Sequence, residues 1–239
     1  MKTIFTAAAI AVVIGSGAAV IAASGTHEKS AGTGGVAVIR DGETMTQGSG
    51  RLVRVARATA PFRRVIADDG VNVEIAFGPR HEMLVEADDN LVGRVTTSTE
   101  NGELRIGATG SYRTRNAPTV RIVTPLLERV DLHSSSEALL AGIGATRLVL
   151  SSNGSGSFRG DGRVGGLEIE LSGSGDADLA GLRADDVRIE LNGSGEAQVN
   201  AARSLRAEVN GSGNIRYAGD PERVERSVHG TGTISPAGR

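Results

Sequence analysis

Short stretches of alternating apolar and polar residues recur in the second half of the chain. The clearest are LEIEL, VRIEL, LRAEV and VERSV, at residues 167–171, 187–191, 205–209 and 224–228. Alternation with a period of two is typical of a strand with one buried and one exposed face. A glycine-rich turn follows each stretch, and a second, shorter alternation follows that turn. The pattern predicts two short strands in every repeat.

The turns define a repeat of about nineteen residues. They read NGSGS, SGSGD, NGSGE, NGSGN and HGTGT, and their first glycines are 19, 20, 18 and 19 residues apart. One repeat earlier, HSSSE from His133 fits the same frame with serine in place of both glycines. Internal repeats of this length predict a solenoid in which equivalent strands stack on one another.

Stacked strands lie ~4.8 Å apart, so the corners of successive repeats must nearly superimpose. Glycine supplies positive φ values at such a corner and leaves room for the next corner. We therefore interpret the turn glycines as structural rather than ligand-binding. They are Gly154, Gly156, Gly173, Gly175, Gly193, Gly195, Gly211, Gly213, Gly230 and Gly232.

The first half of the chain also alternates, but with a different spacing. Strands are predicted over residues 71–77, 82–87, 95–108 and 119–125, and Asn101-Gly102 predicts a hairpin turn inside the third range. We expect these strands to open the same stack and to cover its N-terminal edge. The fold class is therefore all-β, a parallel β-solenoid with rungs of about nineteen residues.

The N-terminus indicates export. Lys2 precedes an uncharged stretch from Thr3 to Ala23, which predicts a signal peptide over residues 1–23, with an uncleaved anchor as the alternative. Residues 24–50 are rich in Gly, Ser and Thr and favour a flexible linker, although VAVIR (36–40) could form a short strand. The solenoid domain is expected over residues 51–239.

Composition narrows the chemistry further. The chain has no cysteine, which excludes disulfides, thiolate metal sites and cysteine nucleophiles. Its net charge of −2 gives no overall attraction to nucleic acid. One local basic stretch contains Arg51, Arg54, Arg57, Arg63 and Arg64. We interpret it as a solvated strand face, with contact to an anionic envelope surface as the alternative.

Several segments resemble the auto-transporter adhesin head GIN domain family, a domain of unknown function. They are PFRRVIADDGVNVEIAFG, VEADDNLVGRVTTSTENGELRI, the SGSGD, NGSGE and NGSGN turns, and IRYAGDPERVERSVHGTGTI. The resemblance covers about residues 51–236. It implies an exported bacterial protein with a right-handed parallel β-helix or β-solenoid. It implies no catalytic residues, and the HSSSE turn departs from the family's glycine pattern.

Two sets of acidic residues are candidates for surface binding. Glu170, Glu190 and Glu208 fall at one position of three consecutive repeats, so their carboxylates are predicted to stack, with Glu168, Arg188 and Arg206 in the neighbouring column. We expect the two arginines to offset much of the repulsion. A charge-balanced, solvated face is the main interpretation of these columns, and a stripe that binds a cation or a sugar is the alternative.

A second column of polar residues follows the turns and includes Asp176 and Glu196, with Asp178 beside it. Such oxygen ligands suit calcium, but the nonapeptide frame of calcium-binding β-rolls is absent. Hydrogen bonding to the corner backbone explains the column more simply. No metal or cofactor site is therefore predicted.

The sequence thus predicts a non-enzymatic, adhesin-like cell-envelope protein in the periplasm or on the outer surface of a bacterium. Its expected partner is an envelope polysaccharide or another surface protein, with membrane contact only through an uncleaved N-terminus. Two alternatives remain open. One is a polysaccharide-active enzyme that uses carboxylates such as Asp176 and Glu196. The other is a scaffold that self-associates into a homo-oligomer through the last rung.

Overall fold

A computed structural model describes residues 37–40 and 43–238 of the chain. These residues form eighteen strands and one short 3-10 helix, and they contain no α-helix. The all-β solenoid predicted from the repeats is therefore confirmed. The segment expected to be a signal peptide or anchor lies outside the described residues. Within them, no helix is long and apolar enough to cross a membrane.

The strands of the first half are β1 (Ala37–Arg40), β2 (Glu43–Gln47), β3 (Leu52–Arg57), β4 (Arg64–Ala67), β5 (Asn72–Phe77), β6 (Glu82–Asp88), β7 (Val95–Glu100), β8 (Glu103–Ala108), β9 (Tyr112–Arg113) and β10 (Thr119–Thr124). The 3-10 helix η1 is Val92–Arg94. The strands of the second half are β11 (Arg129–Ser134), β12 (Glu137–Gly154), β13 (Ser157–Gly173), β14 (Ala177–Gly193), β15 (Glu196–Gly211), β16 (Asn214–Ala218), β17 (Arg223–Gly230) and β18 (Thr233–Pro236).

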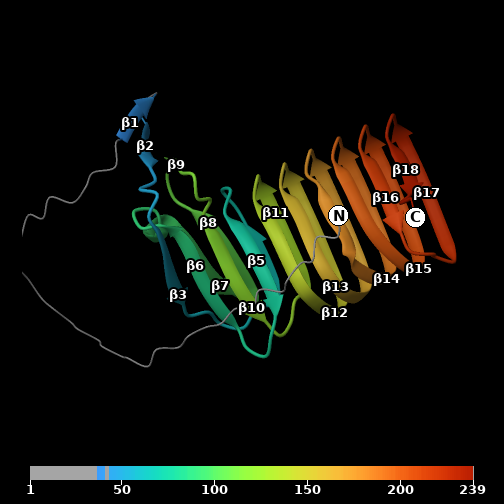
Figure 1. The fold of residues 1–239 in the computed structure, drawn as a ribbon, viewed down its shortest axis with the longest axis horizontal. Helices are drawn as coiled ribbons and strands as arrows, with labels where there is room; N and C mark the ends of the chain where they lie inside the picture. Colours follow the sequence, from blue (N-terminus) through green and yellow to red (C-terminus); the bar gives the residue numbers. More distant parts are fainter. Residues whose placement is uncertain (1–36, 41–42, 239) are drawn as a thin grey trace, which may run out of the picture. The chain divides into compact units, whose positions relative to one another are not determined.

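Strands β12 to β15 are 16 to 18 residues long, and each contributes to two sheets. Their C-terminal parts lie in the first sheet, which has the order β7-β8-β4-β11-β12-β13-β14-β15-β17. Their N-terminal parts lie in the second sheet, with the order β3-β6-β10-β5-β12-β13-β14-β15-β16-β18. Figure 1 shows β11 to β17 side by side in chain order.

The parallel register follows the frame of the glycine turns. Every first-sheet strand from β11 onward ends at the same corner, and the residues paired there are Ser134, Gly154, Gly173, Gly193, Gly211 and Gly230. Each long strand also has a register shift near its middle, for example between Asp178 and Arg183. The backbone changes direction there and passes from one sheet to the other.

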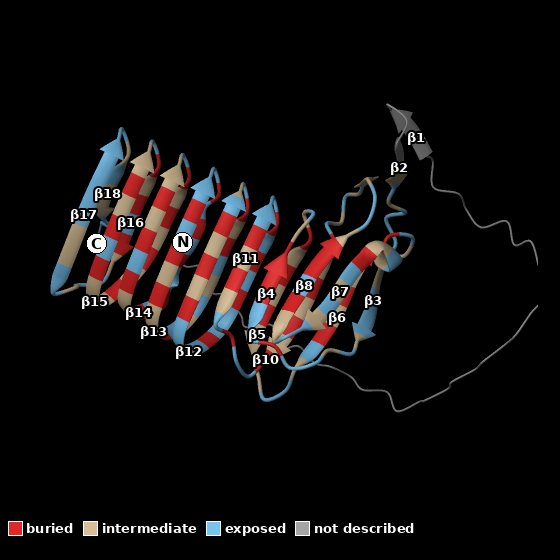
Figure 2. Ribbon diagram, turned by 180° about the vertical axis from the view of Figure 1, so that it is seen from behind, coloured by how far each residue is buried: buried red, intermediate tan, exposed pale blue. Residues whose placement is uncertain are grey.

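Alternation buries one side of each sheet against the other, as the stripes in Figure 2 show. Ile169, Ile189 and Ala207 pair in register and are only 1%, 1% and 2% exposed. We call this column the inner file. Side chains of the second sheet, such as Leu179 and Val199, are fully buried opposite the first sheet. The core is therefore a narrow layer of aliphatic side chains that continues from rung to rung.

The corner glycines are required by the backbone of the preceding rung. Gly173 has a φ of +124°, and a Cβ placed on it would lie 2.2 Å from the Gly154 carbonyl oxygen. Gly175 has no positive φ, but its Cβ would lie 2.1 Å from the Gly156 carbonyl oxygen. The first glycine of a turn therefore needs both backbone freedom and space, whereas the second needs only space.

The HSSSE turn lies at the start of this column of corners. Ser134 has a φ of +62°, which lies in the left-handed region that some non-glycine residues adopt. The first glycines of the later turns have φ values between +124° and +144°. Ser136 is fully buried. Serine thus replaces the two turn glycines only in the turn from which the column begins.

The N-terminal strands open the stack, as expected. β5 and β4 pair in parallel with β12 and β11, while β6, β3 and β7 make antiparallel pairs at the same end. Asn101 and Gly102 both have positive φ and form the turn of the β7–β8 hairpin. Antiparallel strands at this end replace the next parallel rung.

Part of the segment expected to be a flexible linker forms strands instead. β1 pairs antiparallel with β2, and β2 pairs with β9. Gly48 donates its amide to the Arg113 carbonyl oxygen at 2.8 Å, which ties this segment to β9. Composition predicted a linker because glycine and threonine are frequent here. Pairing with β9 depends on residues about seventy positions away and does not show in that composition.

The last rung breaks the inner file. Arg226 of β17 pairs with Ala207 and so takes the position that Ile169 and Ile189 hold in earlier rungs. Its side chain is exposed, and its Nη1 lies 3.4 Å from the Ile234 carbonyl oxygen, to which it donates. A charged residue at an inward position of an edge strand discourages the addition of another strand.

Candidate functional site

The outward face of the first sheet carries the stacked glutamates. Glu170 pairs with Glu190, and Glu190 pairs with Glu208, one residue along from the inner file and on the opposite face of the sheet. At a strand spacing of ~4.8 Å, the three carboxyl groups form a continuous column across β13, β14 and β15. We call Glu170, Glu190 and Glu208 the acidic ladder.

Asparagines, not cations, contact the acidic ladder. Asn192 donates to Glu190 at 2.9 Å, and Asn210 donates to Glu208 at 3.2 Å. Asn210 also donates to the side-chain oxygen of Asn192 at 2.8 Å, which links the two rungs. No ladder carboxylate forms an ion pair with any residue the structure describes.

The arginines beside the ladder form no ion pair with its carboxylates. Glu168, Arg188 and Arg206 do form the neighbouring column. Arg206 lies 3.6 Å from Glu225, however, and Arg188 has no ion pair within the described part of the chain. The reason is geometric, because the nearest carboxylate for Arg206 lies in its own column on the next rung.

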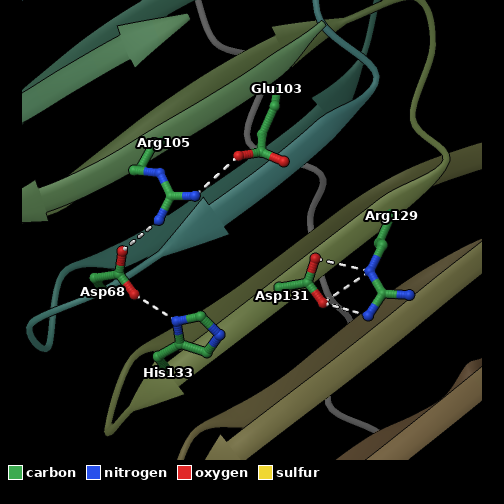
Figure 3. A network of polar contacts seen from close by, with 6 residues as sticks. All are labelled: Asp68, Glu103, Arg105, Arg129, Asp131 and His133. Atoms are coloured by element: carbon green, nitrogen blue, oxygen red, sulfur yellow. Dashed lines mark hydrogen bonds and ion pairs between the residues drawn. The ribbon is translucent and has the colours of Figure 1, made fainter. Parts of the chain in front are cut away.

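Charges nearer the N-terminus on the same sheet are paired, as Figure 3 shows. Arg105 lies 3.0 Å from Glu103 and 3.7 Å from Asp68, and Asp68 lies 2.5 Å from the His133 ring nitrogen. Beside them, Arg129 holds Asp131 through contacts of 2.7 and 2.8 Å. The hydrogen bond to Asp131 raises the pKa of Arg129. We call these six residues the paired network.

The acidic residues that follow the glycine turns form contacts within the protein. Asp176 Oδ1 accepts a hydrogen bond from the Glu196 amide at 2.8 Å, and the Glu196 carboxylate lies 2.6 Å from Arg216. Asp178 is exposed and lies in the next outward column of the second sheet, in register with Gln198. Asp176 and Glu196 thus bind the corner backbone and a neighbouring rung, which is the simpler of the two interpretations of this column.

No group of three or more His, Asp or Glu side chains in the described part of the chain is arranged to hold a metal ion. Among the acidic side chains, Asp186 has a strongly lowered pKa. It lies in β14, where the strand enters the first sheet. Arg203 donates two hydrogen bonds to its carboxylate and Ser204 donates a third, and these lower the pKa of Asp186 to about 2. This site holds β14 and β15 together.

Sequence reasoning missed a buried carboxylate in the N-terminal half. Asp88 is 1% exposed at the end of β6 and accepts hydrogen bonds from Thr114 at 2.6 Å and Asn116 at 2.8 Å. Burial acts to raise the pKa of Asp88, but these hydrogen bonds lower it below 3.8. The sequence shows the EADD segment that contains Asp88, but the hydrogen-bond partners of Asp88 lie in a loop that has no repeat or motif.

A family model described as "Putative auto-transporter adhesin, head GIN domain" matches residues 61–221. This match spans most of the solenoid, from the residues before β4 to those before β17. The chain therefore belongs to this family, and the resemblance seen in the sequence is confirmed.

Solved structures share the fold at low sequence identity. One, described as a "putative adhesin" from Bacteroides fragilis, is 22% identical with a TM-score of 0.65, and the match covers 80% of this chain and 99% of that one. Another, described as a "Putative lipid binding protein" from Parabacteroides distasonis, is 18% identical with a TM-score of 0.51 and covers 81% and 100%. None of the curated proteins matches the chain. At these identities the likeness shows the fold alone.

Proposed function

We propose that the protein is a non-enzymatic, exported protein of the bacterial cell envelope that binds a polysaccharide along the acidic ladder. Export is supported by the charged and apolar pattern of residues 1–23 and by the adhesin-like family. The periplasm and the outer surface both fit. The proposal for the binding surface rests on the outward face of the first sheet.

The observation that supports it best is that none of the three stacked carboxylates forms an ion pair with a described residue. Like charges directly opposite each other on a sheet are destabilising, so the column has a cost for the fold. Each carboxylate keeps acceptor capacity for an external donor, and the same group recurs at three consecutive rungs. A polymer of repeating units offers donors with a similar periodicity.

The negative charge of the acidic ladder indicates which class of polysaccharide it can bind. Three adjacent carboxylates repel a polyanion, whereas sugar hydroxyl groups or protonated amines donate hydrogen bonds to them. Asn192 and Asn210 lie beside the carboxylates and add amide groups to the same surface. Each contact is weak by itself, and repeated contacts along one chain increase the overall affinity. We therefore expect a neutral or amine-bearing polysaccharide.

The experiment is a binding screen of the exported chain against immobilised polysaccharides. The panel contains neutral glucans, an amine-bearing polymer such as chitosan, and a uronate-rich polymer such as alginate. We expect the neutral or amine-bearing members to bind and the uronate polymer not to. Binding to the uronate polymer alone, or to none of the three, contradicts the proposal.

The same panel separates binding from catalysis. The candidate catalytic carboxylates Asp176 and Glu196 already contact the Glu196 amide and Arg216 respectively, which supports a structural role. We expect no release of reducing ends from any bound polymer. Release that disappears in the Asp176→Ala, Glu196→Ala double variant would instead favour the enzyme.

A further inference from the structure

A second surface feature lies at the other end of the first-sheet strands from the glycine corners. It is an open hollow of about 470 Å³, formed where β4, β8 and β11 begin. Its size falls within the range of about 300–1,000 Å³ that is usual for small-molecule sites. We call it the cationic hollow, defined here by Phe62, Arg63, Arg64, His81, Leu126 and Glu128.

One part of the hollow is apolar. The rings of Phe62 and His81 lie against each other with their centroids 4.9 Å apart, and Phe62 is only 1% exposed. Thr124 Oγ1 lies 3.3 Å from the His81 Nδ1 atom, which holds the imidazole ring in place. Leu126 is 40% exposed at the same hollow. An apolar group could therefore pack against Leu126 and the half-buried His81 ring, with Phe62 supporting the ring from beneath.

The rest of the hollow is positively charged and has a fixed backbone. The Gly102 carbonyl oxygen accepts the amides of Arg63 and Arg64 at 2.8 and 3.2 Å, and the Arg63 carbonyl oxygen accepts the Glu128 amide at 2.8 Å. The lining contains two arginines and one carboxylate. Glu128 pairs with Arg63 at 3.0 Å, which leaves Arg64 uncompensated within the hollow.

Arg64 is the one arginine of the basic stretch for which the described residues provide no side-chain partner. Arg51, Arg54, Arg57 and Arg63 all contact carboxylates or carbonyl oxygens. The register places Arg64 between Glu103 and Arg129, but Glu103 is paired with Arg105 and Arg129 with Asp131. Arg64 therefore has no carboxylate of its own among the described residues.

We propose that the cationic hollow binds a ligand with one carboxylate or phosphate group attached to an apolar or sugar moiety. Arg64 provides the planar, bidentate donor that such anions prefer. Leu126 and the half-buried His81 ring provide the surface for the attached moiety. This site is separate from the acidic ladder, so its failure would leave the proposed polysaccharide binding untouched.

The test is a binding titration of the full-length chain with three probes: inorganic phosphate, glucuronate, and vesicles of phosphatidylglycerol with phosphatidylcholine vesicles as a reference. We expect saturable binding of at least one anionic probe, with shifts of the amide signals of residues 62–64, 101–102 and 126–128. Preference for the phosphatidylglycerol vesicles identifies a lipid headgroup as the source. Preference for free glucuronate identifies a sugar acid.

Arg64→Gln is expected to weaken binding about tenfold or more, because a hydrogen-bonded charge contact is lost. It should leave the fold unchanged, since Arg64 forms no side-chain hydrogen bond or ion pair with a described residue. Arg188→Gln is the matched control: Arg188 is exposed on the same sheet, has no ion pair within the described residues, and should leave affinity unchanged. Equal weakening by both variants, or no saturable binding of any probe, would overturn the proposal.

Discussion

Two regions on the outward face of the first sheet differ in whether their charged side chains form ion pairs. In the paired network near the N-terminus, each charged group contacts an opposite charge on the same or a neighbouring strand (Figure 3). Across β13 to β15, the acidic ladder repeats one carboxylate at every rung and contacts only asparagines among the described residues. The same sheet thus contains a region whose charges are satisfied internally and a region whose charges are not.

The difference follows from how each region is built. The paired network comes from strands with unrelated sequences, so each charge faces a different residue on the next strand. The ladder comes from repeats that copy one residue to one position, so like charges must stack. Pairing serves the fold, whereas unpaired carboxylates at regular intervals remain open to a ligand. The following predictions test this comparison, beginning with the largest effect.

The stacking beneath the ladder depends on the corner glycines. Gly173→Ala is expected to reduce the free energy of unfolding by about 3 kcal/mol, because the new Cβ meets the Gly154 carbonyl oxygen at a strained φ. Gly166→Ala in the same strand is the control, since its Cβ lies 3.9 Å from the nearest atom, on Arg147. Urea unfolding measures both. Equal effects of the two variants would show that corner stacking does not limit stability.

Carboxylates that are hydrogen-bonded in the N-terminal half should contribute to stability in a pH-dependent way. The pKa of Asp88 is lower in the folded protein than its ordinary value of 3.8, so the ionised group stabilises the fold above that pH. The contribution is lost as the pH falls through the folded pKa. Asp88→Asn should cost about 2 kcal/mol at neutral pH.

The cost of Asp88→Asn should shrink in acid, where the wild-type carboxyl group is protonated as well. Urea unfolding at pH 7 and at several values below 4 measures this change. Asp178→Asn is the control, because Asp178 is exposed and has no ion pair or side-chain hydrogen bond in the described part of the chain. A cost of Asp88→Asn that stays constant with pH would contradict the account.

The ladder ends at the last rung, where the repeat also loses its apolar inward residue. Arg226→Leu restores an aliphatic side chain in the inner file at the open edge of β17. We expect this variant to form concentration-dependent dimers in sedimentation velocity experiments, while the wild-type chain remains monomeric. A wild-type chain that already associates through this edge would favour the self-associating scaffold instead.

The smallest effect concerns the ladder itself. Replacing Glu170, Glu190 and Glu208 by glutamine removes the repulsion between stacked carboxylates and should increase stability by about 0.5 kcal/mol at low salt. The gain should disappear at high salt, since these groups are exposed or half-buried. Replacing Glu103, Glu168 and Glu225 instead should give no gain, because each contacts an arginine. Thermal unfolding at two salt concentrations compares the two triple variants.

Repetition explains which features could be predicted from the sequence. The inner file of Ile169, Ile189 and Ala207 and the stacked glutamates follow from the spacing of the glycine turns, because residues one repeat apart must become neighbours. The serine turn could be placed in the same frame. Local patterns were sufficient for these features because every rung has the same geometry.

Features made by non-repeating partners could not be predicted in this way. Asp88 is satisfied by Thr114 and Asn116, which lie in a loop without periodicity. The lack of a partner for Arg64 becomes visible only when Glu103 is seen to pair with Arg105. The strand β2 likewise depends on β9. Each case needs the position of a residue from a distant segment, and no local pattern supplies it.

The central claim is that unpaired, stacked carboxylates form the binding surface, and the two triple glutamine variants test it most directly. Both remove three negative charges from the same sheet, so their net charges are equal. Calorimetric titration with the polysaccharide identified by the screen should show that the Glu170, Glu190, Glu208 variant loses binding about tenfold or more. The Glu103, Glu168, Glu225 variant should bind like the wild type. Equal losses in the two variants, or no loss in either, would contradict the account.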